Sequence, residues 1–140
     1  LRSKGADTVL VQRFMKEDLD VYIKRSKLIE RAEIYHDTIA ITKGEPGQTY
    51  GGVLLAQAAD TLLTMSGISA SFVISERDDG RIGVSARSLG DVNVQVIMEK
   101  MNGGGHLTNA ATQIEDTTVE DTEALLKDIL EEYFTGGETE

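Results

Sequence analysis

Three consecutive glycines, Gly103, Gly104 and Gly105, stand directly before His106, one of only two histidines in the chain. Glycine loses more backbone entropy on ordering than any other residue, so a fold gains no stability from such a run. Without side chains, the backbone can approach a ligand closely and direct several N–H groups at one anion, and His106 can add a donor. The run predicts a phosphate-binding loop, although a flexible linker with a surface histidine explains these residues equally well.

Arg87, with Ser85 and Ser88 beside it, is a second place where phosphate could bind. A guanidinium group can bind two phosphate oxygens at once, and the serine hydroxyls offer further donors. An arginine at a strand end is more often a surface charge, so the prediction depends on where Arg87 falls. It lies between a predicted hairpin and a helix that ends at the glycines, and strand ends and following loops in a sheet fold often share one crevice.

His36 lies beside Asp37 and would suit a metal ligand or a general base, but a surface histidine is the favoured interpretation. A two-metal hydrolytic site needs several carboxylates and imidazoles that converge on the ions. This chain has no cysteine, no HExxH pattern and only scattered carboxylates. The sequence therefore predicts that the metal site of a hydrolase lies outside this chain.

The length of 140 residues suits one compact domain, and the net charge of −10 repels long polyanions unless a basic patch reverses the field locally. Such a patch is offered by Lys24, Arg25, Lys27 and Arg31. It could contact nucleic acid, but the surrounding acidic residues favour a salt-bridged helix surface. The apolar runs are too short to span a bilayer. Because the chain begins with Leu1 rather than Met, we expect a piece of a longer protein.

Hydrophobic spacing predicts an alternation of helices and strands. The expected elements are two helices over 7–32 separated by polar residues 16–18, a strand at 38–42, a helix at 49–65 that ends towards Gly67, a hairpin of strands 68–76 and 81–86 with a two-residue turn at Asp79 and Gly80, a helix at 91–101 with Ser88 at capping distance, a strand at 111–115 and a helix at 118–134. This order predicts an α/β (α+β) fold with a mixed sheet packed by helices. We divide the chain into a helical linker arm (1–33), a globular domain (34–135) and a disordered tail (136–140).

Residues 83–88 (GVSARS), followed by residues 103–106 (GGGH), resemble the DHH-associated C-terminal domain of DHH phosphoesterases. That family includes RecJ-type exonucleases, nanoRNases and cyclic-di-AMP phosphodiesterases, and the resemblance covers roughly residues 34–134. Residues 91–102 and 106–112 look most similar to the membrane-anchored bacterial cyclic-di-AMP phosphodiesterases. In those proteins a degenerate sensor domain and a GGDEF-like domain precede the DHH domain, whose end the arm at 1–8 resembles.

The resemblance implies a division of labour in which a DHH domain holds two manganese ions and the DHH-associated domain holds the nucleotide. It implies substrate-binding roles for Ser85, Arg87, Ser88, Asn102, Gly103, Gly104, Gly105, His106 and Asn109. The sequence departs from the family in one place. The family commonly has two alanines and a glycine from the third residue after the histidine, where this chain has Asn109, Ala110 and Ala111. That difference argues against a generic exonuclease.

From this resemblance we expect the substrate-binding domain of a metal-dependent phosphodiesterase that hydrolyses cyclic-di-AMP to linear pApA. The alternatives are a nanoRNase-like domain for short oligonucleotides and a non-enzymatic module for nucleotide binding or dimerisation. Expected partners are a cyclic dinucleotide or short oligonucleotide, the DHH domain of the same chain and a second copy of the chain. We expect no cofactor in this chain, manganese on the DHH domain, no hydrolysis by this fragment alone, and a cytoplasmic domain without membrane contact in a parent anchored in the bacterial membrane.

Overall fold

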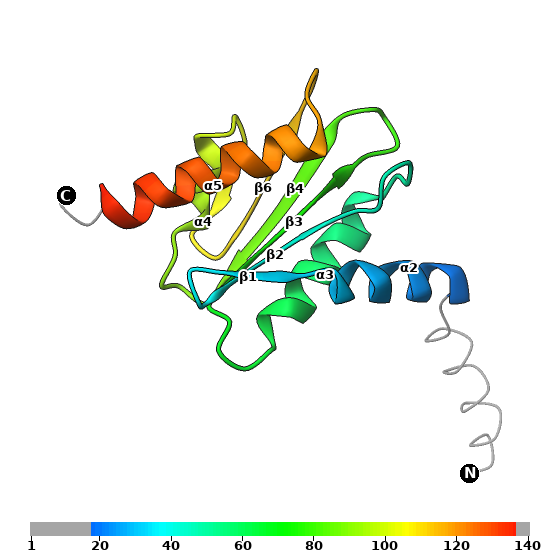
Figure 1. Ribbon diagram of the computed structural model, residues 1–140, viewed down its shortest axis with the longest axis horizontal. Coiled ribbons are helices and arrows are strands. Elements are labelled where there is room, and N and C mark those ends of the chain that lie inside the picture. Colours follow the sequence, from blue (N-terminus) through cyan, green and yellow to red (C-terminus); the bar gives the residue numbers. More distant parts are fainter. Residues whose placement is uncertain (1–17, 137–140) are drawn as a thin grey trace, which may run out of the picture.

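The computed structural model describes residues 18–136, so the first predicted helix of the arm and most of the predicted tail lie outside the described residues. Six strands form one mixed sheet in the order β1-β2-β3-β4-β6-β5 (Figure 1). The elements are α2 (Leu19–Glu30), β1 (Glu33–Tyr35), β2 (Ile39–Lys43), α3 (Gly52–Leu63), β3 (Ala70–Glu76), β4 (Ile82–Ser88), α4 (Val94–Glu99), β5 (Gly104–His106), β6 (Asn109–Ile114) and α5 (Val119–Thr135). This architecture confirms the predicted mixed sheet packed by helices.

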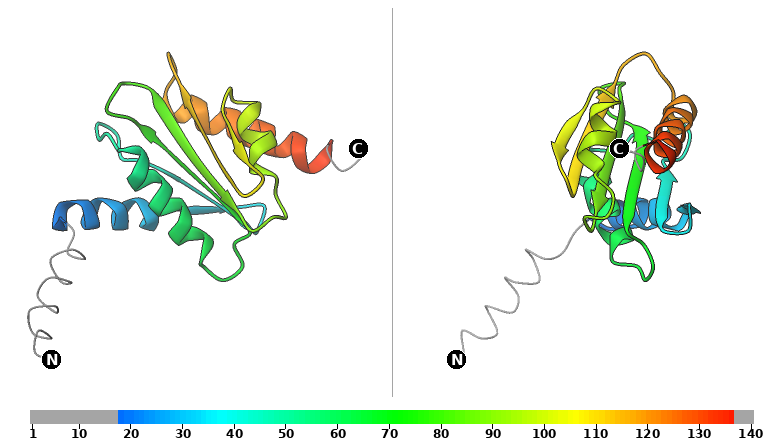
Figure 2. Two further views of the ribbon diagram at one scale, coloured as in Figure 1. Left: turned by 180° about the vertical axis from the view of Figure 1, so that it is seen from behind. Right: turned by 90° about the vertical axis from the view of Figure 1, so that its left-hand side faces the viewer.

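Helices cover the two faces of the sheet and enclose separate cores. We call the face that packs against α2 and α3 the α3 face; its core includes Leu28, Leu55, Ala58 and Val73. The other, the α5 face, packs against α4 and α5, and its core includes Phe72. Figure 1 looks onto α5, and the left-hand view of Figure 2 looks onto α3. Only β2 and β3 run parallel, and the other neighbouring strands are antiparallel.

The helix α2 confirms the predicted second helix of the arm. It begins directly after Asp18, whose side chain accepts a hydrogen bond from the N–H of Asp20 and caps the first turn. Leu28 is fully buried, and the hydroxyl of Thr42 on β2 donates to the Leu28 carbonyl oxygen at 2.6 Å. The helix is therefore packed onto the sheet, while the division of the chain at residues 33 and 34 stays a prediction.

The strand β2 confirms the one expected at 38–42, but the sequence analysis missed β1. The two strands pair through Tyr35 and Ile39, and the chain reverses between them. His36 and Asp37 both take positive φ, 54° and 67°, a conformation that histidine and aspartate adopt more readily than most residues. His36 is thus an exposed turn residue, and its Nε2 lies 2.8 Å from Oε2 of Glu131 on α5.

Because of Tyr35, we expect the free energy of unfolding to fall at alkaline pH. Partial burial, together with the hydrogen bond from its hydroxyl to Oε2 of Glu131 at 2.5 Å, raises the pKa of Tyr35 to about 12. Folding thus favours the neutral phenol. The resulting stabilisation of the folded state is complete below the ordinary pKa of about 10 and is lost as the pH rises towards 12. The free energy of unfolding, measured with urea, should fall more steeply between pH 9 and pH 11 in the unmodified chain than in Tyr35→Phe. Equal slopes would contradict this account.

The hairpin expected from residues 68–86 is present as β3 and β4, but the two-residue turn at Asp79 and Gly80 was wrong. Arg77 donates its N–H to the Arg81 carbonyl oxygen at 2.8 Å, so the loop has three residues, 78–80. The Gly80 N–H donates to the Arg77 carbonyl oxygen at 3.0 Å, and Gly80 alone in this loop has positive φ (87°). A turn followed by a left-handed glycine is the usual geometry of a three-residue hairpin loop.

Two helices are shorter than predicted, because residues other than Gly67 and Ser88 end the first and cap the second. The helix α3 ends at Leu63, and Gly67 forms a later turn with φ 84°. The helix α4 starts after Asn93, whose side chain accepts the N–H of Val96 at 3.2 Å. Ser88 therefore does not cap this helix. It is the last residue of β4, and its hydroxyl accepts the Gly90 N–H at 2.8 Å.

Candidate functional site

The glycines that predicted a loop instead lead into an edge strand. Asn102 takes a positive φ of 67°, and the Gly103 N–H donates to the Met98 carbonyl oxygen at 2.8 Å, which ends α4 in a left-handed cap. The chain then enters β5 at Gly104 and pairs with β6. The expectation that these glycines form a loop was wrong, because the helix cap and the strand occupy the whole run, while phosphate binding by them stays a prediction.

Close packing against β6 explains two of the three glycines. A Cβ atom on Gly103 would lie 2.3 Å from the Ala111 carbonyl oxygen. A Cβ atom on Gly105, whose φ is 145°, would lie 2.5 Å from the Cα atom of Ala110. A Cβ atom on Gly104 would meet nothing within 4 Å. The fold thus requires glycine at 103 and 105, contrary to the first interpretation of the run, and leaves Gly104 accessible.

Arg87, Asn109 and His106 form one row across three strands. Arg87 on β4 pairs with Asn109 on β6, and Asn109 pairs with His106 on β5. Directly paired residues of antiparallel strands point to the same face of the sheet. In the next row, Ala111 pairs with both Ser85 and Gly104, so these residues lie on that face too. The pairing therefore brings five of the predicted site residues together.

Arg87 lies beside α3, while no helix within residues 18–136 covers Asn109 and His106 on the α3 face. The helix α3 packs on β3 and β4, while Asn109, Ala111 and Gln113 on β6 are exposed and the residues between them are buried or half-buried. His106 is also exposed. In the right-hand view of Figure 2, the yellow strand β5 lies at the edge of the molecule opposite α5. We call the surface made by Arg87, Gly104, His106, Asn109 and Ala111 the open face; Ser85 is on the same side of the sheet but is buried, with 7% exposure.

Arg87 stands at the border between α3 and the open face, and its guanidinium group is held on one side. Nε donates to Oδ1 of Asp60 on α3 at 2.7 Å, and Nη1 donates to the Ala86 carbonyl oxygen at 3.0 Å. Its side chain is 14% exposed. None of the described residues accepts a hydrogen bond from Nη2. An arginine fixed through Nε and Nη1 is preorganised for a phosphate oxygen.

The structure does not bring every predicted residue to this face. Ser88 follows Arg87 directly in β4, and consecutive strand residues point to opposite faces. Its buried hydroxyl bonds to the Gly90 N–H, so it does not support Arg87. Asn102 lies in the cap that ends α4. Conversely, the sequence analysis missed Asp60, although a signal existed, because it is the only charged residue of α3.

The residues from 18 to 136 do not fit a metal centre. Nowhere among them do three or more histidine, cysteine, aspartate or glutamate side chains come together to hold an ion. We therefore derive no chemical step through a metal ion from this chain. Within the same range, no helix is long and apolar enough to cross a membrane.

The fold resembles that of an exopolyphosphatase-related protein from Bacteroides fragilis, with a TM-score of 0.76 and 20% identity, over 94% of this chain and 40% of the other. The sequence is 60% identical over 137 residues to cyclic-di-AMP phosphodiesterase GdpP from Geobacillus thermodenitrificans, and 56% identical over 136 residues to cyclic-di-AMP phosphodiesterase PdeA from Listeria monocytogenes. These matches cover 98% and 97% of this chain, which spans 21% of the length of each relative. A family model of the DHHA1 domain matches residues 28–135. The chain therefore belongs to the DHHA1 domain family, as its sequence predicted.

Proposed function

We propose that this chain is the nucleotide-holding domain of a metal-dependent phosphodiesterase that hydrolyses cyclic-di-AMP to linear pApA. A DHH domain elsewhere in the parent would hold manganese and activate water, while this domain would hold a phosphate of the substrate. The relatives from Geobacillus and Listeria, both called cyclic-di-AMP phosphodiesterases, support the choice of substrate.

The observation that carries the proposal is the row of Arg87, Asn109 and His106 on an uncovered part of the sheet. Side chains directly opposite each other on neighbouring strands start about 5 Å apart, so donors from three strands can reach the oxygens of one phosphate group. Arg87 would supply the charge through Nη2, and Asn109 and His106 would supply further donors. Gly104 would let the phosphate approach the backbone of β5 without meeting a side chain.

Arg87 and Asn109 can bind and orient a phosphate. Arg87 cannot exchange its proton at any ordinary pH, and a carboxamide has no acid–base role, so their contribution is to fix a phosphodiester in place. Positioning of this kind is a large part of catalysis in phosphoryl transfer. The proposal therefore assigns substrate positioning to this domain and activation of water to its partner domain.

The partners in this proposal are the cyclic dinucleotide and the DHH domain of the same parent chain, with a second copy of the chain as a further partner. The parent would be anchored in the bacterial membrane with this domain in the cytoplasm, as the resemblance implies. Comparing hydrolysis of cyclic-di-AMP with that of a linear dinucleotide by the full-length protein separates this proposal from the nanoRNase alternative.

The division of labour predicts binding without turnover for the 140-residue chain. Because half of the crevice would be missing, we expect it to bind cyclic-di-AMP and pApA weakly, with a Kd on the order of 1 mM. Incubation with manganese and cyclic-di-AMP, followed by chromatography, should show no linear product. Turnover by this chain alone would overturn the assignment of the chemical step to another domain.

A further inference from the structure

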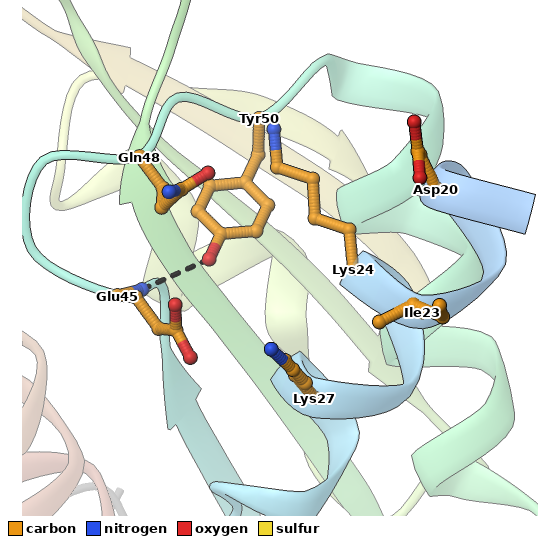
Figure 3. Close-up of a pocket in the computed structure, with 7 residues that line it drawn as sticks. All are labelled: Asp20, Ile23, Lys24, Lys27, Glu45, Gln48 and Tyr50. Atoms are coloured by element: carbon orange, nitrogen blue, oxygen red, sulfur yellow. Dashed lines mark hydrogen bonds between the residues drawn. The ribbon is translucent and has the colours of Figure 1, made fainter.

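A pocket of about 340 Å³ lies between α2 and the segment 44–50 that follows β2. It is lined by Asp20, Ile23, Lys24, Lys27, Glu45, Gln48 and Tyr50 (Figure 3). The segment leaves the sheet where Gly44 bonds to Ile74, near the C-terminal end of β3, whereas Arg87 pairs with Ser71 near the start of that strand. The pocket and the open face are therefore at opposite ends of the sheet.

Two lysines on one side of α2 enter this pocket without a carboxylate partner. Lys24 and Lys27 are three residues apart and so lie on one face of the helix. Nζ of Lys24 donates to the Thr49 carbonyl oxygen and lies 4.6 Å from the centre of the Tyr50 ring. The side chain of Lys27 makes no hydrogen bond or ion pair with any residue from 18 to 136. The salt-bridged surface predicted for this stretch is thus not formed at these two lysines.

The floor of the pocket holds a buried hydroxyl group with an unused donor. Tyr50 is 2% exposed, and its hydroxyl oxygen accepts the Glu45 N–H at 2.9 Å. None of the described residues accepts a hydrogen bond from the hydroxyl group in return. A buried donor without an acceptor is unfavourable, so an acceptor from outside the chain would be favoured here. An oxyanion in the pocket could accept from this hydroxyl and from a lysine of α2.

The opposite side of the pocket offers acceptors. In Figure 3, Glu45 and Gln48 from the loop face Lys24 and Lys27 from α2 across the Tyr50 ring. Asp20 adds a second carboxylate to the lining. Carboxylates in nucleotide sites commonly accept hydrogen bonds from ribose hydroxyls. The lining thus combines donors for an oxyanion with acceptors for hydroxyl groups, in a volume within the usual range for small-ligand pockets.

We propose that this pocket binds a sugar phosphate of the nucleoside-monophosphate class. The phosphate would contact Lys24, Lys27 and the Tyr50 hydroxyl, and the sugar hydroxyls would donate to Glu45 and Asp20. The proposal is independent of the function proposed for the open face, because the two surfaces share no residue.

Titrations of the 140-residue chain that carries Arg87→Ala test this site without interference from the open face. Amide NMR spectra should shift at residues 44–50 when AMP or ribose 5-phosphate is added, and should not shift when adenosine is added. Lys27→Ala, which removes no side-chain hydrogen bond or ion pair within residues 18–136, should raise the Kd for AMP at least tenfold. The matched control Lys100→Ala removes a lysine that pairs with Glu132 and should leave the Kd unchanged.

Three results would overturn the proposal. The first is an absence of shifts at 44–50 at millimolar AMP. The second is an unchanged Kd in Lys27→Ala. The third is equal affinity for inorganic phosphate and AMP, which would remove the role of the sugar. Tyr50→Phe gives a second check, because it removes the buried donor while it keeps the ring, and should also weaken AMP binding.

Discussion

Replacing Arg87 by alanine in the full-length parent should lower kcat/KM for cyclic-di-AMP about 100-fold, which corresponds to the loss of one charge-assisted contact with phosphate. The guanidinium is fixed by Asp60 and Ala86, and Nη2 has no acceptor among the described residues, so under the proposal its removal takes away a phosphate donor. Most of the change should appear in KM, because the contact holds the substrate both before and during reaction. Steady-state kinetics with purified protein measures both kcat and KM.

Two further variants test whether the effect of Arg87→Ala comes from the contact that Arg87 makes and not from the loss of a positive charge. Arg81→Ala removes an exposed arginine that pairs with Asp79 in the β3–β4 turn, so its kcat/KM should stay near that of the unmodified enzyme. Asp60→Asn keeps an oxygen beside Nε but weakens the hold on Arg87, and should give a smaller rise in KM. If Arg87→Ala leaves hydrolysis intact, the substrate-holding role is wrong and an interaction role gains support.

Substitution of Gly105 by alanine should destabilise the chain by about 3 kcal/mol, from the strained φ and the clash with β6 together. Its φ of 145° is unfavourable for any residue with a Cβ atom, and that atom would meet Asn109 and Ala110 at 2.5 Å. The edge pairing of β5 with β6 would have to open to relieve the contact. Urea unfolding followed by circular dichroism gives the difference in free energy.

Gly104→Ala is the matched control for Gly105→Ala. The new methyl group meets nothing within 4 Å, so stability should change by less than about 0.5 kcal/mol. If a phosphate approaches the backbone of β5, the methyl group should nevertheless weaken nucleotide binding. Equal destabilisation by the two variants would contradict the packing described for this strand.

The sequence analysis found the components of the open face but not their arrangement. Arg87 and His106 were recognisable because their residue types suit phosphate. That Arg87 stands beside Asn109 depends on the pairing of β4 with β6, and α4 and β5 intervene between these strands in the chain. Register of this kind follows from tertiary packing and is not encoded in local spacing.

The wrong and missed predictions from the sequence have similar physical causes. Glycine is depleted in strands, so a run of three predicted a loop, yet close packing against β6 makes glycine necessary at two positions of the run. The strand β1 is only three residues long, and its turn uses histidine and aspartate in place of the expected glycine. The contact of Asp60 with Arg87 joins α3 to β4 across 27 residues, which helical spacing alone does not reveal.

The most direct measurement of the central claim is an amide NMR titration of the unmodified 140-residue chain with pApA. Shifts should concentrate at the backbone amides of Arg87, Gly104, His106 and Asn109, which lie in two neighbouring rows of the open face. They should disappear from these residues in Arg87→Ala. If millimolar pApA leaves these amides unchanged, or shifts them equally in Arg87→Ala, the open face is not the nucleotide-binding surface.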